Sequence, residues 1–394
     1  MPRALWLLVI GMAVNVTGSS FLWPLNTIFI HDQLGKSLSV AGVVLMLNAG
    51  ATVIGNLIGG SLFDTIGGYR SVLIGIGISL LSLFGMVFWH GWPEYIVFLT
   101  ILGFGSGIVF PSMYAMAGSV WKEGGRKSFN AMYVATNLGV AIGAALAGLI
   151  ASYSFDYIFI ANALMYVVFL FIAVFGYRNL DIKGAQQTSV IQERTSVRGN
   201  PKLYALFILL IGYILCWVGY VQWQSTISSY TQEIGISLKQ YSMLWTINGA
   251  LIVLGQPLVN LLVKRVKSLK TQIIIGILIF AVSFGIVGSA QAFSGFLAAM
   301  IILTIGEMLV WPAVPTIAND LAPKGREGFY QGIVNSTATG GRMIGPLLGG
   351  VLVDLYGMQM LFGILMLLLL VSIYTTLIYD KKLNKKKPVT AVSS

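Results

Sequence analysis

Long apolar stretches separated by short polar ones run along the whole chain. Most are about 20 residues or longer, the length that a helix needs to cross the hydrocarbon core of a bilayer. The pattern predicts twelve membrane-spanning helices, at residues 4–30, 38–62, 71–89, 94–118, 129–152, 156–177, 203–226, 241–263, 271–290, 293–318, 328–353 and 358–379. The first stretch is too long for a signal-peptide core, so we interpret it as a retained helix.

The most polar interior stretch, residues 178–202, separates six predicted helices from six more. The two halves echo each other at an offset of about 200 residues, as where Phe110-Pro111 recurs as Trp311-Pro312. A parallel duplication explains this echo. We therefore predict an all-α integral membrane protein with 12 transmembrane helices in two pseudo-symmetric six-helix halves. Its parts are the halves 1–177 and 203–379, a cytoplasmic linker at 178–202 and a basic cytoplasmic tail at 380–394.

Composition and charge agree with a bilayer location. Hydrophobic residues make up 57% of the chain and charged residues 9%, whereas soluble domains carry about 25% charged residues. The net charge of +11 would suggest a nucleic-acid partner for a soluble protein, but here it orients a membrane protein instead. If both termini are in the cytoplasm, 21 of the 24 lysine and arginine residues lie on the cytoplasmic side of the membrane. Only Lys36 and Lys239 lie on the outer side, and only Arg342 lies within a span. We expect a multi-pass protein of a bacterial cytoplasmic membrane, with both termini cytoplasmic and no nucleic-acid partner.

Several kinds of chemistry find no support in the sequence. The single cysteine, Cys216, excludes an intramolecular disulfide and a cysteine-cluster metal site, and two histidines leave no zinc-binding helix motif. No phosphate-binding loop and no nucleophile elbow motif occurs. We therefore expect no metal, no cofactor and no enzymatic activity.

Two charged residues lie near the middle of predicted spans, Glu307 in 293–318 and Arg342 in 328–353. A charge at mid-bilayer costs at least about 2.5–3.5 kcal/mol on insertion scales, so it must be paired, hydrated or neutralised. Both residues lie within about two positions of the span midpoints, hence at similar depth in consecutive helices. We predict that Glu307 carries a proton with Arg342 as its partner. The alternatives are a static structural pair and, for Arg342, a structural or anion-binding role.

Uncharged polar and aromatic residues inside the spans suggest a substrate cavity. Tyr213, Trp217 and Tyr220 share one helix face at i, i+4 and i+7, although such a stripe is also typical of packed or lipid-facing helices. Asparagine and glutamine residues in other spans add hydrogen-bonding groups without charge. The candidates are Asn15, Asn26, Asn137, Tyr213, Trp217, Tyr220, Asn248, Gln256 and Trp311. Together they favour amphipathic organic molecules over sugars or peptides.

The segment from Gly60 to Arg70, between the second and third spans, has the sequence Gly-Ser-Leu-Phe-Asp-Thr-Ile-Gly-Gly-Tyr-Arg. It resembles the signature cytoplasmic loop of the major facilitator superfamily, G-x-L-x-D-x-x-G-x-x-R in outline. Twelve spans, duplicated halves and a central linker extend the resemblance to the whole chain, which implies the major facilitator fold. The resemblance also implies that Gly60, Asp64, Gly67 and Arg70 form a conformational latch, with Asp64 joining the halves on the cytoplasmic side. The alternative for Asp64 is an ordinary solvated charge at a helix end.

The segment from Thr304 to Pro312, which contains Glu307, resembles the corresponding span of bacterial multidrug exporters. This resemblance implies the multidrug/proton antiporter branch of the superfamily. Our leading hypothesis is a monomeric secondary active transporter that exports amphipathic or lipophilic small molecules in exchange for protons, by alternating access. The alternative is proton-coupled uptake or exchange of a small organic solute, with Arg342 as counter-ion if the solute is anionic. A membrane enzyme or scaffold is the third reading, and no nucleophile or metal constellation supports it.

Overall fold

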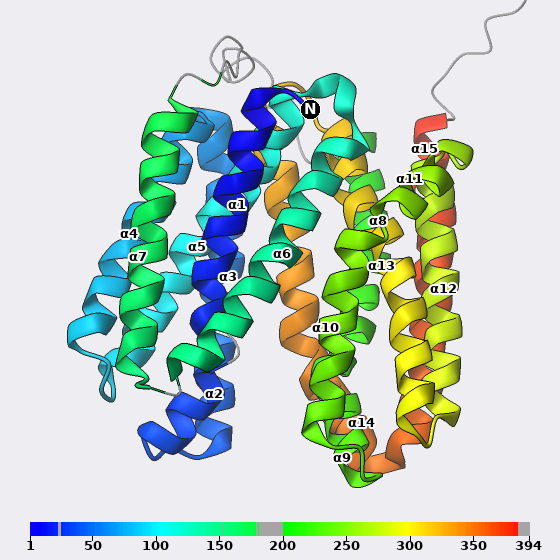
Figure 1. Cartoon of the computed structure of the whole chain (residues 1–394). Coiled ribbons are helices and arrows are strands. Elements are labelled where there is room, and N and C mark those ends of the chain that lie inside the picture. The colour runs from blue at the N-terminus through cyan, green and yellow to red at the C-terminus, as the bar shows by residue number, and fades with distance from the viewer. Residues whose placement is uncertain (23–24, 152, 179, 181–199, 385–394) are drawn as a thin grey trace, which may run out of the picture. The chain divides into compact units, whose positions relative to one another are not determined.

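The computed structural model describes residues 1–22, 25–151, 153–178, 180 and 200–384, and this part of the chain is almost entirely helical (Figure 1). Its α-helices are α1 (Arg3–Leu22), α2 (Asn26–Ile28), α3 (Leu38–Ile66), α4 (Gly68–Phe88), α5 (Glu94–Val120), α6 (Arg126–Ala151), α7 (Asp156–Ile172), α8 (Pro201–Val221), α9 (Thr226–Glu233), α10 (Leu238–Leu254), α11 (Gln256–Arg265), α12 (Leu269–Ser289), α13 (Phe293–Leu321), α14 (Glu327–Ile378) and α15 (Lys381–Asn384). Short 3-10 turns at Lys122–Gly124 and Gln222–Gln224 and π-helical turns at Phe29–Gln33 and Ala173–Tyr177 extend them.

Within the described residues, the predicted number of membrane spans is confirmed. Ten helices are long and apolar enough to cross a membrane, and the bent pair α10 and α11 gives an eleventh span. One of the ten, α14, is two helices, because Gly357 with φ 79° and ψ 170° interrupts it. Counting its parts separately gives twelve spans in the predicted order. The predicted linker and tail lie largely outside the described residues, at 181–199 and 385–394.

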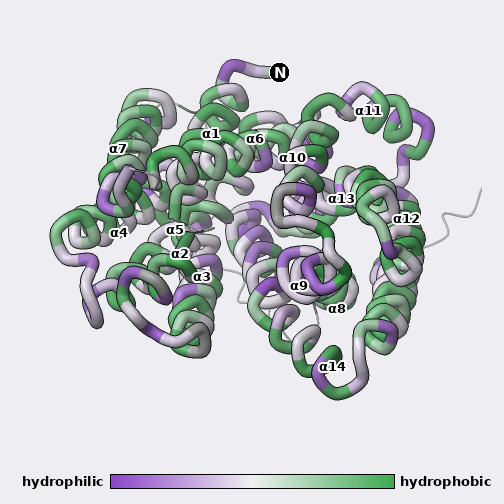
Figure 2. Tube along the Cα trace, turned by 60° about the horizontal axis from the view of Figure 1, so that its bottom comes forward, coloured by the Kyte–Doolittle hydropathy of each residue, from purple (hydrophilic) through white to green (hydrophobic). Residues whose placement is uncertain are grey.

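The outer surface of the helices is apolar. Leu81, Phe175 and Leu254 are 74%, 77% and 76% exposed, values that a soluble protein would avoid for such large side chains. Figure 2 shows green, the hydrophobic colour, over much of the helical tube. Because each helix satisfies its own backbone hydrogen bonds, such a surface is stable against lipid.

Glycines bring neighbouring helices into close contact. A Cβ atom placed on Gly59 of α3 would lie 2.5 Å from Ile108 Cα of α5, and one on Gly143 of α6 would lie 2.5 Å from the Thr17 carbonyl oxygen of α1. Gly55 and Gly139, one helical turn earlier, are equally close to α5 and α1. In lipid, where apolar burial drives little association between helices, this close van der Waals packing holds the bundle together.

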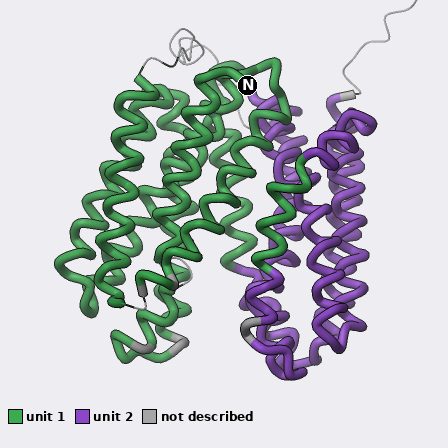
Figure 3. Tube along the Cα trace, viewed as in Figure 1, with its two compact units in different colours: residues 1–188, 245–256, 323–343 green, residues 189–244, 257–322, 344–394 purple. Residues whose placement is uncertain are grey.

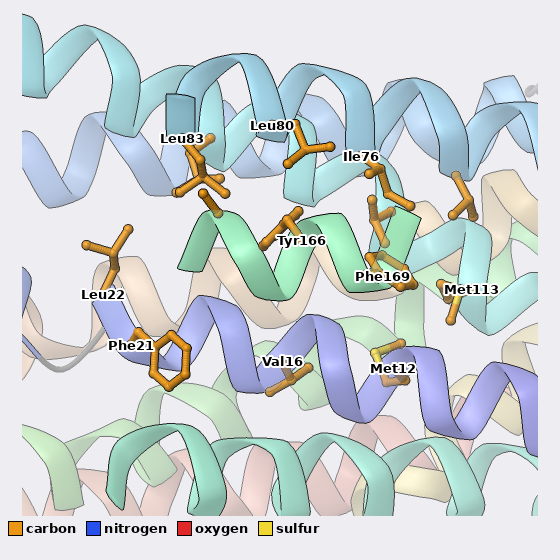
Figure 4. Packing of buried hydrophobic residues seen from close by; sticks show 14 of the residues in the cluster. Met12, Val16, Phe21, Leu22, Ile76, Leu80, Leu83, Met113, Tyr166 and Phe169 are labelled. Carbon is orange, nitrogen blue, oxygen red and sulfur yellow. The ribbon is translucent and has the colours of Figure 1, made fainter. Parts of the chain in front are cut away.

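The chain forms two compact units (Figure 3). Unit 1 combines the described part of residues 1–188 with Trp245–Gln256 and Pro323–Met343, and unit 2 contains the other described residues. Figure 4 shows the core of unit 1, where Phe21 of α1, Tyr166 and Phe169 of α7 and Leu80 of α4 fill the space between their helices.

One unit boundary coincides with a break in a span. The helices α10 and α11 meet at an angle of 56° around Gly255, and residue 257, the first of the next segment of unit 2, is a proline. Proline has no backbone N–H to continue the hydrogen-bond ladder. At the same break, the Gln256 side chain donates from its Nε2 to the Ile252 carbonyl oxygen at 2.6 Å.

Candidate functional site

Asp64 binds the beginning of α14 within unit 1. Its Oδ1 accepts a hydrogen bond from the Gly328 backbone N–H and its Oδ2 accepts one from the Phe329 N–H, each at 2.8 Å. Asp64 lies near the C-terminal end of α3, where the helix dipole is unfavourable for a carboxylate, and it is only 8% exposed. The first amides of α14 have no intrahelical acceptors, so they supply both the hydrogen bonds and the positive dipole end that this carboxylate needs.

Glycines make this contact between α3 and α14 possible. A Cβ atom on Gly60 would collide with the Gly328 backbone, and one on Gly328 would collide with the Gly60 carbonyl oxygen. One turn further along α14, a Cβ atom on Gly332 would lie 2.5 Å from the Asn56 carbonyl oxygen. The two helices therefore touch backbone to backbone, and Asp64 is held within reach of the amides of α14.

The other two residues of the predicted latch have separate positions. Gly67 joins α3 to α4 with φ 86°, a left-handed conformation that favours glycine. Arg70 is exposed and forms no hydrogen bond or ion pair with any residue that the structure describes. The structure thus brings together Gly60 and Asp64 with α14, and the part that Arg70 takes in a latch stays a prediction.

Further polar contacts join α3 and α14 within unit 1. Asn56 Nδ2 donates to Thr339 Oγ1 at 3.5 Å, and Ser336 Oγ donates to the Val53 carbonyl oxygen at 3.2 Å. Arg342 Nη2 donates to Thr339 Oγ1 at 3.3 Å. Arg342 therefore belongs to unit 1, whereas Glu307 belongs to unit 2, and their pairing stays a prediction.

Glu307 is buried in unit 2, with 1% of its surface exposed. Its Oε2 accepts a hydrogen bond from Trp311 Nε1 at 3.2 Å, one helical turn further along α13. The residues i and i+4 of a helix lie on the same face, so the acid and the indole move together as parts of one helix. A neutral indole N–H stabilises a carboxylate less than a paired base or a helix N-terminus does.

Trp311 is the centre of an aromatic cluster in unit 2. The Trp217 indole stacks on it with ring centroids 4.3 Å apart and planes 11° apart, while Tyr213 and Tyr220 meet it edge-on at 5.5 Å and 5.6 Å. These four candidates, predicted separately from α8 and α13, are thus in contact. Phe280 of α12 completes the cluster at 5.6 Å, and sequence reasoning missed it because one phenylalanine in an apolar span carries no distinguishing signal.

The amide candidates have different surroundings. Asn26 Oδ1 accepts from the Tyr95 hydroxyl at 2.6 Å, and Asn137 Nδ2 donates to the carbonyl oxygen one turn before it at 2.9 Å. Gln256 Oε1 accepts from Asn130 Nδ2 of α6 at 2.7 Å. Asn15 and Asn248 are buried. Asn26, Asn137 and Gln256 therefore bind other groups of unit 1, and contact with a substrate stays a prediction for all five amides.

Apolar spans with exposed apolar surfaces define a multi-pass membrane protein. The family model described as Major Facilitator Superfamily matches residues 8–230 and 224–393, so the chain belongs to this superfamily. It is therefore a transporter of a small-molecule substrate and not an enzyme, as predicted.

Relatives of known sequence agree with this assignment. The chain is 64% identical over 395 residues to the uncharacterized MFS-type transporter YttB of Bacillus subtilis (strain 168), covering 100% of this chain and 99% of that one. It is 23% identical over 358 residues to the multidrug resistance protein MdtH of Aeromonas hydrophila, covering 89% and 87% of the two chains. Among solved structures, a bacterial homologue of the iron transporter ferroportin in an outward-facing state has a TM-score of 0.78 at 15% identity, covering 96% and 100%. That likeness shows the shared fold.

Proposed function

We propose that this protein is a monomeric, proton-coupled exporter of amphipathic or lipophilic small molecules in a bacterial cytoplasmic membrane. The observation that carries the proposal is the burial of Glu307 against the aromatic cluster of Trp311, Trp217, Tyr213 and Tyr220. The multidrug resistance protein among the relatives supports the choice of substrate class.

The chemistry of the cluster suits flat, apolar substrates. Aromatic side chains offer large rigid surfaces that stack on ring systems at little cost in conformational entropy, and their faces also attract cations. Trp217 now covers one face of Trp311, so separation of these indoles would expose two aromatic faces to a substrate. Such a surface selects by shape and polarity rather than by a fixed set of hydrogen bonds, which is typical of promiscuous binding.

Glu307 supplies the coupling to protons. A carboxylate in the middle of a membrane span is stable when it is neutral or compensated, and unstable when it is charged and alone. Loss of its proton would therefore favour a conformation that offers water, a base or a cationic substrate. When Glu307 exchanges its proton for water, a base or a cationic substrate, the favoured conformation of the transporter changes, and this links proton binding to conformation.

The contact of Asp64 with α14 supplies the conformational switch. Two charge-assisted hydrogen bonds and a backbone-to-backbone contact hold α3 and α14 together. The distribution of Lys and Arg predicts that this contact lies on the cytoplasmic side of the membrane. Alternating access requires this contact to break in one of two states, and Asp64 then biases the equilibrium toward the closed one.

The test uses proteoliposomes with an imposed pH gradient and a clamped membrane potential. The probe is a permanently charged lipophilic cationic dye, which a pH difference alone cannot trap. If the protein is an antiporter, the dye should accumulate inside proteoliposomes that have an acidic lumen. Glu307→Gln should abolish this accumulation, while exchange of dye down its own concentration gradient persists. Glu233→Gln, a matched change at an exposed position of α9, should transport as the wild type does.

Two results would contradict the proposal. Full accumulation by Glu307→Gln would remove the coupling role of this residue. Accumulation of a sulfonated anionic dye, driven by the opposite gradient and lost in Arg342→Gln, would establish uptake of anionic solutes instead.

A further inference from the structure

A hollow of about 350 Å³ lies in unit 2, where α12 begins and where α13 and α14 end, near the label α15 in Figure 1. Lys267, Ser268 and Lys270 line it from the start of α12, and Asp320 lines it from the end of α13. Its apolar floor includes Ile317 and Leu321. Because these are the ends of membrane spans, the hollow lies at the level of lipid head groups.

One side of the hollow is positive, although the Ser268 side chain already accepts the Thr271 backbone N–H at the start of α12. The first turn of α12 contains no acidic residue, although the positive end of a helix dipole favours one. Lys267 is exposed and forms no hydrogen bond or ion pair with any described residue. Lys270 is already neutralised, since its Nζ contacts Asp380 Oδ1 at 2.7 Å and the Leu377 carbonyl oxygen at 2.8 Å. The start of α12 together with Lys267 therefore offers a site for an anion.

The other side is negative at the exposed side chain of Asp320. Asp320 lies in the last turn of α13, where the helix dipole is also negative, and that turn contains no basic residue. Within the described part of the chain, its carboxylate forms no hydrogen bond and no ion pair. An ammonium group placed here would satisfy both the carboxylate and the carbonyl end of the helix.

We infer that this hollow binds the head group of a phospholipid that carries a primary ammonium, with its phosphate at Lys267 and the start of α12 and its ammonium at Asp320. An anionic head group would satisfy Lys267 but leave Asp320 without a cation. A choline head group has no N–H to donate to the carboxylate. The apolar floor formed by Ile317 and Leu321 suits the beginning of the acyl chains.

The experiment measures which lipids stay bound to the full-length protein. Wild-type protein is reconstituted in nanodiscs of equal parts phosphatidylcholine, phosphatidylethanolamine and phosphatidylglycerol, released into detergent and weighed with its bound lipids by native mass spectrometry. We expect phosphatidylethanolamine to be retained in excess over both others. Asp320→Asn should lower the retained ratio of phosphatidylethanolamine to phosphatidylcholine by about fivefold, the effect of one modest charge interaction.

A second variant separates the two halves of the site. Lys267→Gln should lower retention of both phosphatidylethanolamine and phosphatidylglycerol, because it weakens the phosphate contact. Lys264→Gln changes a neighbouring exposed lysine at the end of α11 that does not line the hollow, and it should leave retention unchanged.

Several outcomes would overturn the inference. Equal or greater retention of phosphatidylglycerol, or no effect of Asp320→Asn, would exclude recognition of an ammonium. Absence of retained lipid would exclude the site itself. Displacement of the lipid by millimolar inorganic phosphate from the wild type, but not from Lys267→Gln, would assign the hollow to a free phosphate ligand. None of these results depends on dye transport, so the inference and the proposed function fail separately.

Discussion

Asp64 and Glu307 are both buried carboxylates in a membrane protein, but their surroundings differ. Asp64 is 8% exposed and uses both oxygens to accept backbone N–H groups of α14, each at 2.8 Å. Glu307 is 1% exposed, and its Oε2 accepts the Trp311 indole N–H of the same helix at 3.2 Å. The partners of Asp64 thus lie 264 and 265 residues away, and the indole partner of Glu307 lies 4 residues away.

The difference separates two uses of a buried charge. Helix N-terminal amides are fixed donors that favour the ionised carboxylate, so Asp64 joins two helices only while both stay in place. The indole beside Glu307 is neutral and moves with it, so this contact neither joins helices nor requires the acid to be charged. In the function proposed above, Asp64 has the mechanical role and Glu307 has the proton-exchanging one.

The variants with the largest expected effect test whether Glu307 has a charged partner in addition to the Trp311 indole. If Arg342 pairs with it, Arg342→Ala strands a buried carboxylate and should lower the free energy of unfolding by about 3 kcal/mol or more. The double variant Arg342→Ala/Glu307→Gln should be more stable than the single one, because no charge is left alone. Thermal unfolding in detergent measures both, and additive effects would show that the two residues do not interact.

The next effect concerns the close approach of α3 and α14. Gly60→Leu places a side chain against the Gly328 backbone and should weaken the closed state by about 3 kcal/mol, the upper range for overpacking. The readout is the alkylation rate of a cysteine at Ser336, which faces α3, in a Cys216→Ser background. Gly77→Leu is the control, since a Cβ atom there meets nothing within 4 Å. An equal alkylation rate in both variants would contradict the close contact of α3 with α14.

Asp64→Asn should have a smaller effect in the same direction. The amide keeps one acceptor oxygen but loses the charge, which costs about 1.5 kcal/mol and corresponds to roughly tenfold in the equilibrium between closed and open states. The same cysteine should therefore react faster and transport should slow, while the protein stays folded. Asp354→Asn, at an exposed position of α14, should change neither rate. An unchanged alkylation rate in Asp64→Asn would identify Asp64 as an ordinary charge at a helix end.

The variants with the smallest expected effect separate the role of the Trp311 indole N–H from that of its aromatic ring. Trp311→Phe removes the hydrogen bond to Glu307 but keeps an aromatic face for Trp217, a change of about 1 kcal/mol or roughly fivefold. We expect the rate of gradient-driven transport to fall by up to this factor, because the acid loses a hydrogen-bond donor. Trp311→Leu should in addition weaken dye binding. A Phe variant that loses dye binding as fully as the Leu variant would show that the ring face does not hold the substrate.

The spans and the chemistry of individual positions follow from the sequence alone. Hydropathy is a local property, so twelve apolar stretches predict twelve helices without knowledge of their neighbours. The contact of Glu307 with Trp311 is also accessible from sequence in principle, since helical periodicity places i and i+4 on one face. Gly60 and Asp64 were found through a family motif, which marks positions but names no partner on α14.

Only the tertiary structure decided which helices touch. Gly328 and Phe329 meet Asp64, Phe280 meets Trp311 and Asn130 meets Gln256 across long stretches of chain. The physical reason is that every span is apolar on several faces, so hydropathy does not tell a face against lipid from a face against another helix. In a bilayer, close fit between backbones selects the neighbours, and that fit is a property of two surfaces together.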